Sequence, residues 1–290
     1  MSDSQKQVVQ WFPGHMAKTR RLIKESLSMV DCVTEILDAR IPLASRNPEI
    51  EEITASKPRI ILLNKCDMAD EEITADWIKY FKAQGAEAIA VDCRTGKGLN
   101  AFHPLVKKVL ADKIKANNER GMVGKSLRVM VVGIPNTGKS SFINKMAGRV
   151  RAKVADKPGV TTSNQWFNIG NGIELLDTPG VLWPKFDDPV VGDKIAFIGS
   201  IKDAVIDIET MAVRLIDTLR DGYPEMLAER YKISDFEDLQ SWEILEMIGR
   251  KRGMLISGGE VNTERASVML LDEYRGGKLG RISMEFPDNF

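Results

Sequence analysis

The sequence has few of the residues that mark secreted, disulfide-rich or membrane-spanning proteins. Its 290 residues include only three cysteines, Cys32, Cys66 and Cys93, and none of them has C-x-x-C spacing. So few cysteines argue against a disulfide framework and are typical of reduced thiols in a cytoplasmic protein. The chain has no run of about eighteen apolar residues and no secretory signal at its N-terminus, so we expect neither a membrane span nor export.

The chain also has a net charge of zero, because 41 Lys and Arg residues balance 41 Asp and Glu residues. The two parts of the chain differ, however: residues 1–189 carry 28 basic and 22 acidic side chains, and residues 190–290 carry 13 and 19. A single basic cluster is usually a solvated surface, but three in one part of the chain favour contact with nucleic acid. The three clusters are Lys18, Arg20, Arg21 and Lys24; Lys107, Lys108, Lys113 and Lys115; and Lys145, Arg149, Arg151, Lys153 and Lys157.

The stretch Gly133–Ser140 has the spacing G-x-x-x-x-G-K-S of a phosphate-binding P-loop. The almost uncharged run 127–132 predicts a buried strand before it, and apolar residues at helical spacing predict a helix over 141–147. In this order, backbone N–H groups and the helix N-terminus face the phosphates, and the Ser140 hydroxyl can bind Mg²⁺. We expect phosphate contacts from Asn136, Thr137, Gly138, Lys139, Ser140 and Ser141.

The stretch Asn64–Asp67 fits N-K-x-D and follows a predicted buried strand at 59–63. A carboxylate at Asp67 would accept hydrogen bonds from the ring N–H and amine of guanine, which adenine lacks. Asn64 would bind the purine edge and tie neighbouring loops together, and the stem of Lys65 would cover the base. The pattern therefore predicts guanine binding, with base contacts from Asn64, Lys65, Cys66, Asp67, Asp92 and Cys93.

The last two of these residues belong to Asp92-Cys93-Arg94, which follows a third predicted strand at 88–91. This tripeptide occupies the place of the S-A-K or S-A-L loop whose backbone binds guanine O6. Because the side chains depart from that pattern, we expect Cys93 to contribute only its backbone amide.

The stretch Asp177–Gly180 fits D-x-x-G after the apolar strand predicted at 173–176. Asp177 would hold Mg²⁺ through a water molecule, and the Gly180 N–H would contact the γ-phosphate. A second metal-binding hydroxyl is expected between the P-loop and D-x-x-G. Thr161 is the predicted residue, with Thr162 as the alternative, so the expected metal set is Ser140, Thr161 and Asp177.

Strands and helices alternate up to about residue 189, which predicts an α/β domain with a mostly parallel sheet. Beyond it, helical periodicity predicts an all-helical domain over residues 190–290. Because N-K-x-D precedes the P-loop, the order is a circular permutation of a Ras-like domain, and D-x-x-G leads into the helical part.

The same patterns predict the individual elements. Helices are expected at 17–29, 71–84, 99–115, 193–201, 203–220, 224–231, 235–250 and 262–274, and strands also at 32–38 and in a hairpin around 170–172.

Together these motifs resemble the circularly permuted GTPases of the YlqF/YawG group. The resemblance implies a bacterial cytoplasmic GTPase that cleaves GTP to GDP and phosphate. It also implies binding, in the GTP state, to rRNA and precursors of the 50S ribosomal subunit late in assembly, with a monomer off the ribosome. The motifs that carry it are Gln10–Lys18, Asp38–Pro42, Arg46–Pro48, Asn64–Asp67, Gly133–Ser140, Pro158–Thr161 and Asp177–Gly180.

Catalysis should need a partner, because Leu182 stands where Ras-like enzymes place a water-orienting glutamine. We expect slow intrinsic hydrolysis that the ribosomal subunit stimulates. His15, in a Pro-Gly-His turn, is the candidate catalytic residue; packing or RNA contact is the alternative role for it. Related potassium-activated GTPases use an asparagine at the position of Asn136, so K⁺ is a second hypothetical cofactor.

Two other functions compete with the assembly GTPase. A small-molecule NTPase or nucleotide kinase is disfavoured by N-K-x-D and by the lack of a substrate-acid motif. A GTP-regulated adaptor that binds protein without contacting RNA remains the alternative.

Overall fold

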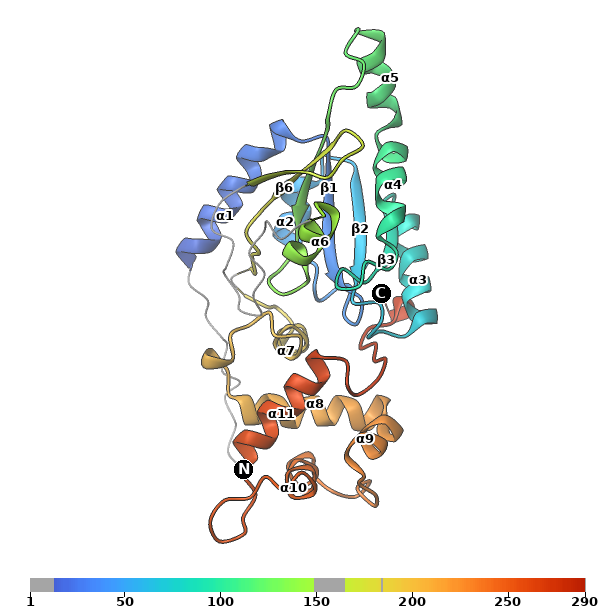
Figure 1. Ribbon diagram of the computed structural model, residues 1–290. Coiled ribbons are helices and arrows are strands. Elements are labelled where there is room, and N and C mark those ends of the chain that lie inside the picture. The colour runs from blue at the N-terminus through green and yellow to red at the C-terminus, as the bar shows by residue number, and fades with distance from the viewer. Residues whose placement is uncertain (1–12, 149–164, 184, 290) are drawn as a thin grey trace.

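The computed structural model describes residues 13–148, 165–183 and 185–289, with side chains from Met16 onward. A six-stranded sheet has the order β3-β2-β1-β4-β6-β5, and helices pack on both of its faces. A layer of helices lies beyond one edge of this domain (Figure 1). The strands are β1 (Cys32–Asp38), β2 (Arg59–Asn64), β3 (Glu87–Val91), β4 (Leu127–Val132), β5 (Gln165–Asn168) and β6 (Ile173–Asp177).

Five strands run parallel, and β5 alone among the described strands is antiparallel, where it forms a hairpin with β6. All seven residues of β1 are buried, because helices cover both faces of a parallel sheet. The strands predicted from apolar runs are confirmed to within a residue at their ends. The α/β fold class is therefore confirmed.

Helices on the two faces of the sheet build separate hydrophobic cores. On one face Phe102 and Phe142 meet edge to face, with ring centroids 4.9 Å apart. On the other face Trp77 and Phe81 lie against β1 and β2. The helices are α1 (Pro13–Ser26), α2 (Pro48–Thr54), α3 (Glu71–Ala83), α4 (Phe102–Val109), α5 (Ala111–Glu119) and α6 (Lys139–Met146), with 3-10 turns at Leu27–Met29 and Leu99–Ala101.

The prediction of one continuous helix over 99–115 was wrong. The helix breaks at Leu110, whose φ of −104° and ψ of 21° lie outside the helical range. The chain resumes in α5, which runs on to Glu119.

Beyond Asp188 the described chain is mostly helical, with α8 packed against α7, α9, α10 and α11. Helix α10 begins at Ser241 rather than at 235, because Gln240 and Glu243 form a capping box there. A boundary at residue 190 stays a prediction. No helix in the described ranges is long and apolar enough to cross a membrane. The helices are α7 (Pro189–Phe197), α8 (Ile208–Gly222), α9 (Pro224–Tyr231), α10 (Ser241–Lys251) and α11 (Thr263–Arg275), with 3-10 turns at Asp203–Val205 and Pro287–Asn289.

The C-terminal segment, residues 279–286, returns from the helical layer to the sheet domain and ends beside α3 (Figure 1). Its backbone pairs with two loops at the carboxyl edge of the sheet. Ile282 N donates to Met68 O at 2.9 Å, and Met284 N donates to Arg40 O at 2.8 Å. The end of the chain is thus attached to the loops that follow β1 and β2.

Candidate functional site

The P-loop connects β4 to α6 and fits between two other strands only because of its glycines. A Cβ at Gly133 would lie 2.6 Å from Ile36 O, and one at Gly138 would lie 2.1 Å from Asn64 Nδ2. Gly138 also has a φ of 102°, a conformation that disfavours side chains. The loop therefore packs directly on β1 and on the residue that begins N-K-x-D.

Lys139 lies at the start of α6 and is buried. Its Nζ donates to Ile134 O at 2.8 Å, across the P-loop. Burial lowers the pKa of this ammonium to about 8, while the nearby Asp177 opposes the shift. A Cβ at Gly180 would lie 2.7 Å from the same Nζ, so the D-x-x-G loop lies against the P-loop lysine.

Asp177 ends β6, next to β4 in the sheet, and is also buried. Burial raises the pKa of its carboxyl to about 6, and Lys139 opposes this. Among the described residues, its Oδ1 has no hydrogen-bond partner. A buried carboxylate oxygen with no partner among the described residues is available to a ligand, and Mg²⁺ prefers such oxygen donors and hydroxyls. The residues present fit Mg²⁺, with Ser140 and Asp177 as the described residues that would hold it.

The predicted base-binding side of the site is assembled by Asn64 at the end of β2. Its Nδ2 donates to Thr137 O at 2.7 Å, and its Oδ1 accepts from Cys93 N at 2.9 Å. One side chain thus joins the P-loop, the N-K-x-D strand and the loop after β3. Asp67 has one buried oxygen, Oδ1, without a partner in the described chain, as a carboxylate that accepts from a guanine requires.

The loop after β3 is shaped by Asp92 rather than by its exposed residues. The Asp92 carboxylate accepts from Arg94 N at 2.8 Å and from Thr95 Oγ1 at 2.6 Å. Cys93 N, which we expect to bind guanine O6, donates to Asn64 Oδ1 in this structure. Cys66 lies half-buried between these loops, and burial raises the pKa of its thiol.

Two P-loop side chains have structural partners. The Thr137 hydroxyl is buried and donates to Ile134 O at 3.0 Å. Asn136 has a φ of 61°, and its Nδ2 donates to Gly199 O at 2.5 Å, in the loop after α7. Ser140 and Ser141 are half-buried in the first turn of α6.

Several predicted residues fall outside this description. Thr161 and its alternative Thr162 lie beyond the described ranges, and His15 is described only as part of the backbone of α1. Sequence reasoning assigned no role to Asp38 and Arg40, although their motif was noted. Both prove to be buried beside the guanine-side loops.

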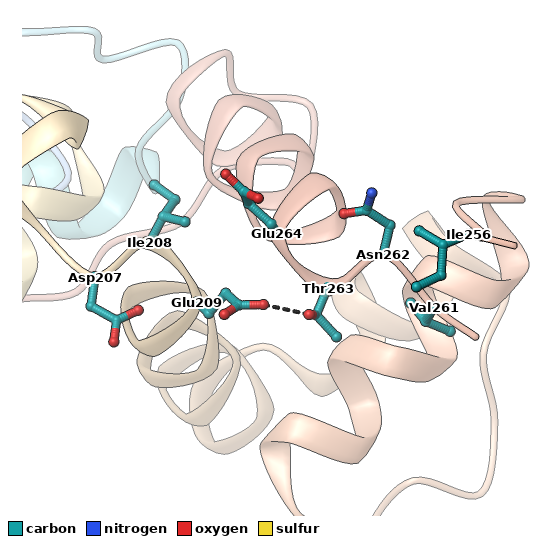
Figure 2. Close-up of a pocket in the computed structure, with 8 residues that line it drawn as sticks. All are labelled: Asp207, Ile208, Glu209, Ile256, Val261, Asn262, Thr263 and Glu264. Atoms are coloured by element: carbon teal, nitrogen blue, oxygen red, sulfur yellow. Dashed lines mark hydrogen bonds between the residues drawn. The ribbon is translucent and has the colours of Figure 1, made fainter.

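A hollow of about 460 Å³ lies elsewhere, between the first turns of α8 and α11 (Figure 2). Figure 2 shows Asp207, Glu209 and Glu264 among its lining residues, with Glu209 hydrogen-bonded to Thr263. These carboxylates would repel phosphates. The hollow is therefore not a nucleotide site.

Replacing Gly138 by alanine should abolish nucleotide binding, because the new methyl group would displace Asn64 from the P-loop. Gly148→Ala is the matched control: its φ of 65° is also positive and disfavours a side chain, but nothing lies within 4 Å of the added Cβ. Titration with a fluorescent GDP analogue should show binding by the control variant only. Comparable affinities for both variants would contradict this arrangement of loops.

The chain resembles known proteins over nearly its whole length. A family model described as "50S ribosome-binding GTPase" matches residues 128–247, which begin at the strand before the P-loop. Ribosome biogenesis GTPase A of Bacillus cereus is 45% identical over 284 residues, which are 98% of this chain and 95% of that protein. The protein of the same name from Thermotoga maritima is 35% identical, over 96% of this chain and 95% of its own.

The fold is also similar to that of a solved structure. The GDP-bound structure of YlqF has a TM-score of 0.67 and 31% identity, and it covers 92% of this chain and 99% of its own. These similarities extend across both the N-K-x-D half and the P-loop half of the sequence. The chain therefore belongs to the ribosome biogenesis GTPase A family and is a circularly permuted GTPase.

Proposed function

We propose that this GTPase is a molecular switch that assists late assembly of the large, 50S ribosomal subunit. In this proposal it binds the precursor particle through rRNA in its GTP state, works in the cytoplasm and is a monomer off the ribosome. The names of the relatives and the description of the family model support a role in ribosome biogenesis.

One observation carries the switch mechanism: both phosphate-side loops touch the helical layer. Ser200 Oγ donates to Pro135 O at 2.5 Å, next to the bond between Asn136 and Gly199. Leu182, two residues after D-x-x-G, packs in the same hydrophobic cluster as α8 and α11. A change at the γ-phosphate can therefore reach the helices through short contacts.

Four basic side chains on α1 are the RNA surface that we propose. Lys18, Arg20, Arg21 and Lys24 are all exposed, although Arg20 pairs with Glu49 at 3.2 Å and Arg21 with Glu25 at 3.3 Å. The cluster on α4 and α5 likewise has two of its four lysines paired, Lys108 with Glu87 and Lys113 with Asp31.

Co-sedimentation with 50S precursor particles tests the switch. More protein should pellet with a non-hydrolysable GTP analogue than with GDP. Binding should weaken steeply with salt, because each lysine–phosphate contact releases counterions. Equal pelleting in both nucleotides would contradict the switch.

Charge-removing variants separate RNA binding from the adaptor alternative. Lys18→Ala combined with Lys24→Ala should lower the slope of log affinity against log salt by about 2, since each phosphate contact contributes about one unit. Lys79→Ala, which removes an exposed lysine paired with Asp76 on α3, is the control and should leave the slope unchanged. If the protein were an adaptor that binds only protein, the wild type, the double variant and Lys79→Ala would show the same weak dependence of affinity on salt.

Hydrolysis is proposed to use His15 as the water-orienting group. Leu182 cannot orient water, because its apolar side chain is 5% exposed and packed in the helical core. His15→Ala should therefore lower ribosome-stimulated turnover by about 100-fold, a typical contribution of acid–base groups, and spare GTP binding. Unchanged turnover would rule out this role.

Mg²⁺ serves GTPases generally, and potassium is proposed as a second cation through Asn136. Its amide is oriented at the P-loop by the bond to Gly199 O. Turnover should be faster in potassium than in sodium at equal ionic strength. Equal rates in the two buffers would contradict a potassium requirement.

A further inference from the structure

Two opposite charges are buried together at the carboxyl end of β1. Asp38 is 0% exposed and Arg40 is 1% exposed. Arg40 Nε donates to Asp38 Oδ1, and Arg40 Nη2 donates to Asp38 Oδ2, both at 2.9 Å. Burying a charge pair is costly unless its geometry is good and its other polar atoms are satisfied. The remaining partners of the pair therefore indicate what the pair does.

The first additional partner of the pair is the lysine of N-K-x-D. Lys65 Nζ lies 2.9 Å from Asp38 Oδ2. Burial alone would raise the pKa of Asp38, but Arg40 and Lys65 outweigh it and hold the pKa of this carboxyl well below its usual range. Asp38 thus remains charged and fixes the ammonium of a side chain whose stem is expected to cover the guanine base.

The second additional partner lies in the helical layer. Arg40 Nη1 donates to Tyr274 O at 2.9 Å, near the last turn of α11, and the guanidinium lies 4.7 Å from the centre of the Tyr274 ring. The backbone carbonyl of Arg40 accepts from Met284 N in the C-terminal segment. One arginine therefore contacts both α11 and the segment that follows it.

We propose that Asp38 and Arg40 form a buried relay that positions Lys65 for guanine binding and connects the base-binding loop to α11. Arg40 is too buried to contact an external ligand, so its role is to act through Asp38 and Tyr274. Occupation of the guanine site would then order the end of α11, on the base side of the nucleotide. This connection runs through Arg40 rather than through the P-loop, although Arg275 of α11 also donates to Phe197 O at 3.1 Å, beside the P-loop contact at Gly199. It does not depend on a ribosomal role.

A double-mutant cycle in GDP affinity tests the positioning step. Lys65→Met and Asp38→Asn should each weaken GDP binding about tenfold, as loss of a charge-assisted hydrogen bond predicts. If Asp38 acts through Lys65, the double variant should bind no more than about twofold more weakly than either single variant. Losses that multiply to about a hundredfold would show independent effects and overturn the relay.

Glu273→Gln is the matched control for general destabilisation. Glu273 adjoins Tyr274 in α11 and is in a half-buried ion pair with Arg230 at 2.6 Å, but none of its described contacts is to the relay. This variant should have a lower unfolding temperature and wild-type GDP affinity. A loss of GDP affinity equal to that of Asp38→Asn would mean that destabilised helices alone explain the result, and would overturn the proposal.

Hydrogen exchange provides a measurement that does not require Asp38→Asn to fold. In the wild type, GDP should slow amide exchange at residues 272–276 and 282–284. In Lys65→Met at saturating GDP that slowing should be smaller than in the wild type, whereas the slowing at Gly199 and Ser200, which adjoin the P-loop, should be unchanged. Equal slowing of residues 272–276 in both proteins would overturn the relay.

Discussion

The nucleotide site depends on the side chain of Asn64. Its amide donates to the P-loop carbonyl of Thr137 and accepts from the amide of Cys93, so both ends of one short side chain are used. These bonds join loops that lie far apart in the sequence. Gly138 permits them, because any side chain there would occupy the space of the asparagine amide. The approach of the two loops fixes where a guanine and its phosphates can lie relative to each other.

The permuted order is compatible with this site because a parallel sheet brings the carboxyl ends of its strands to one edge, whatever their order in the chain. Permutation changes which segment follows D-x-x-G in the chain. Here that segment contains Leu182, which packs against the helical layer. Hydrogen bonds attach the helices to the nucleotide loops both at the P-loop, through Ser200, and at the base side, through Arg40. A GTPase with both attachments can couple its nucleotide to its helices at either end of the ligand.

The sheet and the three nucleotide motifs could be predicted because each is local: a buried strand, then a loop of fixed spacing. The helix break at Leu110 could not, since the apolar spacing continues across it. Nor could the relay, because Arg40 and its partner Tyr274 are 234 residues apart and only the folded chain brings them together.

The most direct test of this account is the GDP affinity of Asn64→Asp, which keeps the shape of the side chain and its acceptor for Cys93. The variant loses the donor to Thr137 O and places an acceptor against that carbonyl. The account predicts a folded protein that binds GDP at least about tenfold more weakly, since an unmet buried acceptor costs about 1–3 kcal/mol. Wild-type affinity in this variant would contradict the claim that Asn64 assembles the site.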